Sequence, residues 1–191
     1  LGLRDPGELL NAARGVIRAE AEALQELEAR MGDDVVRAVR LLAEAKGRVI
    51  VSGIGKSGII GRKIAATLTS TGTPATFRHP VEGLQGGLGI VGRDDVAILI
   101  SKSGESTELT GLVEYLSRLG VAIIAMTGRL DSSLARAATI ALDCAVREEA
   151  CPHDLAPTTS TTVTLAMADA LAVALLLSNG FTRAAFARYH P

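Results

Sequence analysis

Short apolar runs alternate with helical stretches along most of this 191-residue chain, and this alternation constrains the fold most strongly. The runs have no polar face, which is typical of parallel strands covered by helices on both sides. Strands are predicted at 48–52, 74–77, 96–101, 121–127 and, more weakly, 139–143. Helices are predicted at about 5–32, 33–45, 57–71, 106–119, 132–138 and 159–178. The pattern predicts a three-layer α/β/α sandwich with a five-stranded parallel sheet, in one domain over residues 1–191.

Composition removes several classes of function. The chain has 20 Lys and Arg against 21 Asp and Glu, and only 3% of its residues are aromatic. It therefore lacks the basic field and the stacking platforms of a nucleic-acid-binding protein. Cys144 and Cys151 are separated by six residues, which is neither a disulfide framework nor a zinc pattern. With three His and two Cys in the chain, no metal site is expected.

Localisation is inferred from the same features. The first residues, LGLRDPGELL, contain no basic segment followed by an apolar run, so no signal peptide is expected. The stretch TTVTLAMADALAVALLLSNG is interrupted by Asp169, and its unbroken apolar run is far shorter than the span of about 20 residues that crosses a membrane. We expect a buried helix there, no membrane association and a cytoplasmic protein.

The segment IVSGIGKSG, at 50–58, places three glycines directly after the first strand. A Walker loop would need a glycine at position 50, where the chain has Ile50. A dinucleotide site would need an acidic residue at the end of the second strand, where the chain has Phe77, Arg78 and His79. The glycine spacing is therefore weak support for an NAD-dependent oxidoreductase, which NAD titration would test.

The segment SKSGESTE, at 101–108, follows the third strand and begins the next helix. Its hydroxyl residues are Ser101, Ser103, Ser106 and Thr107. Ligands of open α/β sheets bind outside the carboxyl ends of the strands, and a helix start favours anions. A single hydroxyl would suffice to cap the helix, so four hydroxyls indicate a phosphate site that needs no metal.

Three motifs together resemble a known family. GIGKSG, the S-x-S-G-E-S loop and EACPHDLAPTTSTT are similar, in order and separation, to the sugar isomerase (SIS) domain of D-arabinose 5-phosphate isomerases. The resemblance runs from about Val49 to Pro191 and includes GRKIAATLTSTGTP, MTGR and the final His-Pro pair. Members continue into a linker and two CBS domains, so we expect an isolated SIS domain here, with a flavodoxin-like sheet.

The resemblance implies a function and the residues that perform it. It implies interconversion of D-ribulose 5-phosphate and D-arabinose 5-phosphate through an enediol, without a cofactor. The implied catalytic residues are Lys56, Glu108, Glu149 and His190. The implied substrate-binding residues are Ser52, Gly55, Ser57, His79, Gln85, Ser101, Ser103, Ser106 and Thr107. A carboxylate and an imidazole suit acid–base catalysis near neutral pH, and a lysine suits a developing oxyanion.

Each of the four catalytic candidates also has an ordinary explanation. Lys56 could be a solvated residue at a helix start, and Glu108 could complement the positive end of a helix dipole. Glu149 follows another glutamate, and two adjacent acidic residues are often simply solvated. His190 stands next to the end of the chain, where residues are often poorly ordered. We expect Phe181, Phe186 and Tyr189 to hold a short helix at about 181–189 that positions His190.

The sequence departs from the family at two loops. Gln85 stands where members usually carry a second histidine, and Gly87 where they carry an aspartate; Lys102 replaces the usual asparagine of the serine loop. Glutamine can form hydrogen bonds but cannot exchange a proton near pH 7. These changes leave the identity of the phosphosugar open.

Two further expectations concern function class and assembly. A domain that senses sugar phosphates without turning them over, as SIS domains of transcriptional regulators do, remains the alternative to an enzyme. SIS domains typically pair and complete one another's sites, and the apolar stretch from Leu165 to Leu177 offers a surface for this. We expect a homotetramer arranged as a dimer of dimers.

Overall fold

The sheet confirms the predicted fold class. A computed structural model of the chain describes residues 5–182 and residue 187. Five parallel strands form one sheet in the order β2-β1-β3-β4-β5, which is the flavodoxin-like order. The strands are β1 (Val49–Gly53), β2 (Ala75–Phe77), β3 (Val96–Ser101), β4 (Ala122–Thr127) and β5 (Ile140–Asp143). The order reverses between β1 and β3, so the loops after these two strands open onto a common crevice.

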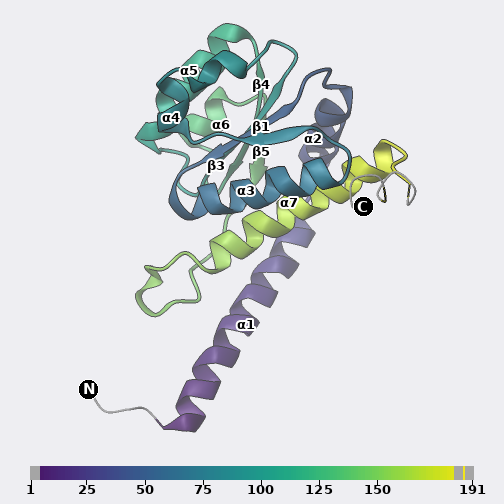
Figure 1. Cartoon of the computed structure of the whole chain (residues 1–191). Helices are drawn as coiled ribbons and strands as arrows, with labels where there is room; N and C mark the ends of the chain where they lie inside the picture. The colour runs from purple at the N-terminus through teal and green to yellow at the C-terminus, as the bar shows by residue number, and fades with distance from the viewer. Residues whose placement is uncertain (1–4, 183–186, 188–191) are drawn as a thin grey trace.

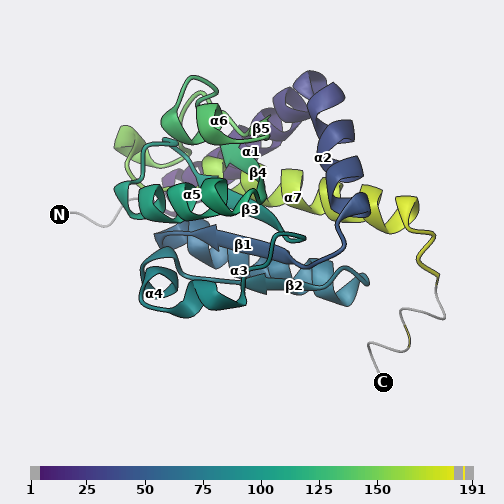
Figure 2. The ribbon, with the colours of Figure 1, turned by 90° about the horizontal axis from the view of Figure 1, so that it is seen from above.

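Helices cover both faces of the sheet (Figures 1 and 2). One face carries α1 (Pro6–Arg30), α2 (Asp33–Glu44), α3 (Gly55–Ser70) and α7 (Thr159–Ser178). The other carries α4 (Pro80–Leu84), the 3-10 turn η1 (Gly87–Ile90), α5 (Thr107–Leu119) and α6 (Ser133–Ala137). A second 3-10 turn, η2 (Pro152–Asp154), lies in the loop before α7.

Alternation along each strand builds two cores. Successive strand side chains point to opposite faces, so Val49 and Val51 pack with α3 and α7 while Ile50 packs with α5. Every residue of β1 and of β3 is buried, which explains why these runs lack a polar face. The central strands thereby fix the loops that follow them.

The segment between β2 and β3 differs from the sequence-based expectation, which was a loop. It contains α4 and η1, and Leu88 of η1 is buried against the α5 side of the sheet. Pro80 occupies the first turn of α4, but glycines at 83, 86, 87 and 89 conceal the helical periodicity. Tertiary burial of this short apolar segment outweighs its weak local preference.

Helix α7 packs as a core helix of this domain. Among the described residues it is the one helix long and apolar enough to cross a membrane by length and composition. It lies against α1, α2 and α3, and Val163, Met167, Leu171 and Leu175 are buried. This packing agrees with the buried helix predicted there.

Helix α1 extends well beyond the body of the molecule (Figure 1). Only Ala23 and Leu27 of its residues are buried. Leu9, Leu10 and Ile17, nearer its beginning, are exposed to 55%, 50% and 68%. Much of the apolar surface near the beginning of α1 is therefore exposed in the single chain.

Candidate functional site

A cleft opens at the carboxyl ends of the strands, where the sheet order reverses. It consists of two adjoining cavities, of about 220 and about 600 Å³. Both are lined by Ile54, Ser57, Lys102, Gly128 and Cys144. The smaller cavity is also lined by Lys56, Ile60, Met126, Thr127, Pro157, Ser160, Thr161 and Thr164. The larger is also lined by Ile100, Ser101, Ser103, Ser106, Glu108, Arg129 and Val146.

The serine loop, residues 101–106, converges on the larger cavity. Ser101 is buried, and its hydroxyl oxygen lies 2.8 Å from that of Ser106. The same Ser101 oxygen accepts a hydrogen bond from the Gly104 N–H group at 3.0 Å. The hydroxyl of Ser103 accepts from the Glu105 N–H group at 3.2 Å. Three of the four predicted hydroxyl residues, Ser101, Ser103 and Ser106, therefore line one volume, and their role in phosphate binding stays a prediction.

The capping explanation for Ser106 predicts a hydrogen bond that the structure does not contain. Ser106 occupies the position before α5, yet its side chain makes no capping hydrogen bond. Ile54, in the equivalent position before α3, provides none either. Two helix starts without side-chain caps therefore face the same cleft, and a helix start with free N–H groups favours an anion.

Contacts from behind hold the serine loop in its shape. Gly104 has φ of 67°, and a Cβ atom there would lie 2.0 Å from the Ser132 hydroxyl oxygen. The oxygen of Gly104 accepts from the Leu134 N–H group at 3.0 Å. The Glu105 carboxylate accepts from the Ser133 N–H group at 2.8 Å. Glycine is required at position 104 because the backbone is left-handed and packed against α6.

The glycines after β1 serve close packing of strand and helix. A Cβ atom on Gly58 would lie 2.7 Å from the Gly53 oxygen, and one on Gly53 would lie 3.1 Å from the Ser57 backbone. Glycine at both positions lets the first turn of α3 approach β1. This turn places Lys56 and Ser57 at the cleft, so the spacing positions the site without requiring a dinucleotide.

Charged groups of both signs border the cleft. Lys56 is exposed and lines the smaller cavity, and Glu108 is exposed and lines the larger one. Arg129, in the loop after β4, lines the larger cavity. The Lys102 side chain borders both. A phosphate, an acid–base group and a cation can therefore be brought together here.

Glu149 is the most strongly perturbed acid of the site. Its side chain is 1% exposed and its carboxylate accepts from Lys102 Nζ at 2.7 Å. It also accepts from the N–H groups of Thr158 and Ser160, at 2.8 and 3.0 Å, and from the Ser160 hydroxyl. Burial raises the pKa of Glu149, but these hydrogen bonds outweigh burial and lower the pKa from 4.5 to about 2.

Cys144 lines both cavities. Burial raises the pKa of its thiol to about 12. The thiol is therefore neutral at physiological pH and behaves as a small apolar group rather than a nucleophile.

Several predicted site residues do not line these cavities. Among the described residues, those outside the cavity walls are Ser52, Gly55, His79, Gln85, Thr107 and Glu149. Ser52 is buried, and its hydroxyl donates to the Arg78 oxygen at 2.7 Å. Gly55 and Thr107 stand at the first positions of α3 and α5. Their roles in binding remain predictions, and His190 lies outside the described residues.

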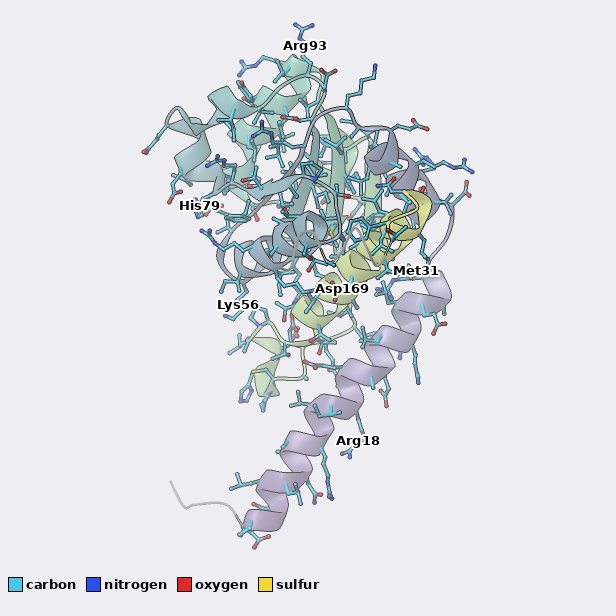
Figure 3. The ribbon with its side chains drawn as sticks, turned by 45° about the vertical axis from the view of Figure 1, so that its right-hand side comes forward. Arg18, Met31, Lys56, His79, Arg93 and Asp169 are labelled. Atoms are coloured by element: carbon cyan, nitrogen blue, oxygen red, sulfur yellow. The ribbon has the colours of Figure 1, made fainter. Side chains whose placement is uncertain are left out.

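His79 and Gln85 lie after β2, apart from the main cleft. His79 precedes α4, whereas Lys56 belongs to the start of α3 (Figure 3). His79 borders a separate cavity of about 170 Å³ together with Arg62, Arg78 and Glu82. The Nδ1 atom of His79 and the Nε atom of Arg78 are buried without a hydrogen-bond partner in the described structure. Gln85 is exposed.

Sequence reasoning missed cleft residues that follow β4 and begin α7. Arg129 stands two residues after the end of β4 in the segment MTGR, and Ser160, Thr161 and Thr164 stand in the first turns of α7. The rule that ligands bind at carboxyl ends of strands applies to the loop after β4 as well. The run of hydroxyl residues TTSTT, at 158–162, was a second signal in the sequence that polar side chains gather at the start of α7.

Comparison with known proteins agrees with this fold. The profile of the SIS domain matches residues 41–174. The arabinose 5-phosphate isomerase KdsD of Pseudomonas aeruginosa is 50% identical over 184 residues, 96% of this chain and 56% of the relative. The arabinose 5-phosphate isomerase GutQ of Salmonella typhimurium is 52% identical over 183 residues, 96% of this chain and 57% of the relative.

A solved structure is similarly close. The structure of E. coli CFT073 c3406 in complex with arabinose 5-phosphate superposes with a TM-score of 0.95 at 39% identity, covering 98% of this chain and 100% of that one. The parallel sheet and the polar crevice at its carboxyl edge define a parallel α/β domain of the doubly wound class. The chain belongs to the SIS domain family, and it spans about half the length of the curated relatives it matches.

Proposed function

We propose that this protein is an aldose–ketose isomerase that interconverts D-ribulose 5-phosphate and D-arabinose 5-phosphate. The observation that carries the proposal is the convergence of the serine loop, two helix starts without side-chain caps, Lys56 and Glu108 on one cleft. The identity of about half to the two arabinose 5-phosphate isomerases supports the choice of substrate. The structural relative described above holds arabinose 5-phosphate, which fits the same chemistry.

The cleft offers an anchor for the phosphate at one end. Ser57, Ser101, Ser103 and Ser106 surround the larger cavity, and the starts of α3 and α5 add backbone N–H groups and favourable helix dipoles. Binding the phosphate there holds the sugar carbons at a fixed distance from it. This positioning reduces the entropy cost of the later proton transfers.

Proton transfer requires a base beside C1 and C2. In the aldose-to-ketose direction, the base removes the proton on C2 while O1 gains a proton, which gives the enediol. A proton is then delivered to C1 while the O2 hydroxyl loses its proton and O2 becomes the carbonyl oxygen. Glu108 borders the cavity with an exposed carboxylate and is our candidate for the base. Lys56 can donate to the enediolate oxygen. His190, by its family role, would open the sugar ring or transfer protons.

We propose that the working unit is a homotetramer in the cytoplasm, arranged as a dimer of dimers. Exposed apolar residues on α1 and α7 support association. Because His79 and Gln85 lie apart from the cleft of their own chain, assembly would let His79 of the partner subunit reach it.

The test is a turnover assay on the purified protein. Ribulose 5-phosphate is added, and the aldose formed is identified by NMR spectroscopy. We expect arabinose 5-phosphate, with loss of rate in Glu108→Gln and Lys56→Met while the affinity for arabinose 5-phosphate persists. Binding of arabinose 5-phosphate without turnover in the wild-type protein would favour the sensor function instead.

A further inference from the structure

Glu149 is separated from the cleft by its own hydrogen-bond partners. Its side chain is 1% exposed, and it does not line either main cavity among the described residues. Lys102 and Ser160, which both donate to its carboxylate, do line the smaller cavity. A ligand in the cleft therefore meets Lys102 and Ser160 before it meets Glu149.

The Glu149 carboxylate is also anchored to a helix start. Oε2 accepts from the N–H groups of Thr158 and Ser160, at 2.8 and 3.0 Å, at the beginning of α7. Oε1 accepts from Lys102 Nζ and from the Ser160 hydroxyl. Both oxygens are thus occupied, and the positive end of α7 favours the negative charge. A group held in this way is suited to position another residue.

Lys102 is held at both of its ends. Its backbone oxygen accepts from the Gly128 N–H group at 3.0 Å, and its Nζ lies 2.7 Å from Glu149. The side chain is 51% exposed and borders both cavities. A lysine ammonium has three N–H donors. One donates to Glu149, so two remain available to a ligand in the cleft.

We propose that Lys102 is a substrate-contacting cation of this site and that Glu149 is the positioning residue that orients it. Lys102 donates to an oxygen of the bound phosphosugar, and Glu149 fixes the ammonium where the two cavities meet. The base of the reaction is then a group other than Glu149. The substrate class rests on the proposed function, whereas the pairing of Lys102 with Glu149 rests on the geometry.

A double-mutant cycle tests the proposal. Affinity for D-arabinose 5-phosphate is measured by calorimetry for wild type, Lys102→Met, Glu149→Gln and the double variant. Loss of a charge-assisted hydrogen bond predicts about a tenfold weakening for each single variant. Because the two residues act as one unit, the double variant should be about as weak as Lys102→Met alone.

Two further variants separate function from folding. Lys102→Arg keeps the charge and should bind within about threefold of wild type, since it can still pair with Glu149. Lys63→Met removes a lysine from another carboxylate pair, with Asp169 between α3 and α7, and should leave affinity unchanged. If Glu149→Gln fails to fold, the comparison of Lys102→Met with Lys102→Arg still decides the role of Lys102.

Three results would overturn the proposal. They are wild-type affinity in Lys102→Met, effects of Lys102→Met and Glu149→Gln that simply add, and a Glu149→Gln variant that loses turnover at unchanged affinity. The last result would return the role of base to Glu149. Because the cycle measures binding, it remains informative if the wild-type protein binds arabinose 5-phosphate and does not isomerise it.

Discussion

The hydroxyl oxygens of Ser101 and Ser106 lie 2.8 Å apart, at the end of β3 and immediately before α5. Neither hydroxyl is used to cap α5, so the pair remains available beside the start of the helix. One hydroxyl donates to the other, so one O–H group of the pair is left for a ligand, next to a backbone that already favours anions.

Removing hydroxyls from the serine loop should weaken substrate binding. We expect Ser103→Ala and Ser106→Ala each to lower the affinity for arabinose 5-phosphate about tenfold, as loss of a hydrogen bond to a charged group predicts. Calorimetry provides the measurement. Ser70→Ala is the control, because that hydroxyl donates within α3 to the Thr67 oxygen. Unchanged affinity in both loop variants would move the phosphate site elsewhere.

Activity should not depend on a metal ion. Among the described residues, no three His, Cys, Asp or Glu side chains gather as metal ligands, and the serine loop and helix starts can hold the phosphate. We expect the same isomerisation rate before and after treatment with EDTA and dialysis. A rate that falls with EDTA and recovers when a divalent cation is restored would contradict this prediction.

Glu149 should make stability depend on pH in the acid range. Its pKa is about 2 in the folded chain, below the ordinary 4.5. The stabilisation is therefore fully present above about pH 4.5 and is lost as the pH falls toward 2, with a total on the order of 3 kcal/mol. The measurement is the free energy of unfolding in urea from pH 7 to pH 2. Glu149→Gln should show a smaller loss over that range, and identical curves would disprove the assignment.

Gly104 should be more sensitive to substitution than another left-handed glycine. Gly104 and Gly120 have φ of 67° and 79°, but only at Gly104 would a Cβ atom overlap a neighbour, the Ser132 hydroxyl. Gly120→Ala should cost about 1 kcal/mol from backbone strain. Gly104→Ala should cost about 1–3 kcal/mol more because of the overlap, and should also weaken phosphosugar binding. Urea unfolding and calorimetry measure both, and equal costs would contradict the role given to α6.

The exposed apolar residues of α1 should mediate assembly. Ile17 is 68% exposed and lies next to Arg18, which Figure 3 shows on the part of α1 that extends from the body. We expect sedimentation to show a tetramer for the wild-type protein and smaller species for Ile17→Asp, because a buried unpaired charge is costly. A fully active wild-type monomer would end the proposal of a tetramer.

Local pattern was sufficient for the main architecture. The runs at 96–101 and 121–127 predicted β3 and β4 because buried parallel strands are apolar on both faces. The serine loop was located by the same reasoning, since residues that follow such strands lie at the carboxyl edge of the sheet. The glycine-rich segment of α4 and η1 was missed, because its local preference is weak and its order comes from packing against α5.

The sequence by itself determined the succession of strands and helices along the chain, the position of the serine loop and the presence of Lys56 and Glu108 at helix starts. Those features follow from periodicity and from the short range of backbone preferences. Only the tertiary structure decided that Lys102 and Glu149, 47 positions apart, form one ion pair. It also decided that Glu149 is buried behind Lys102, because burial and hydrogen-bond partners depend on which distant segments the fold brings together.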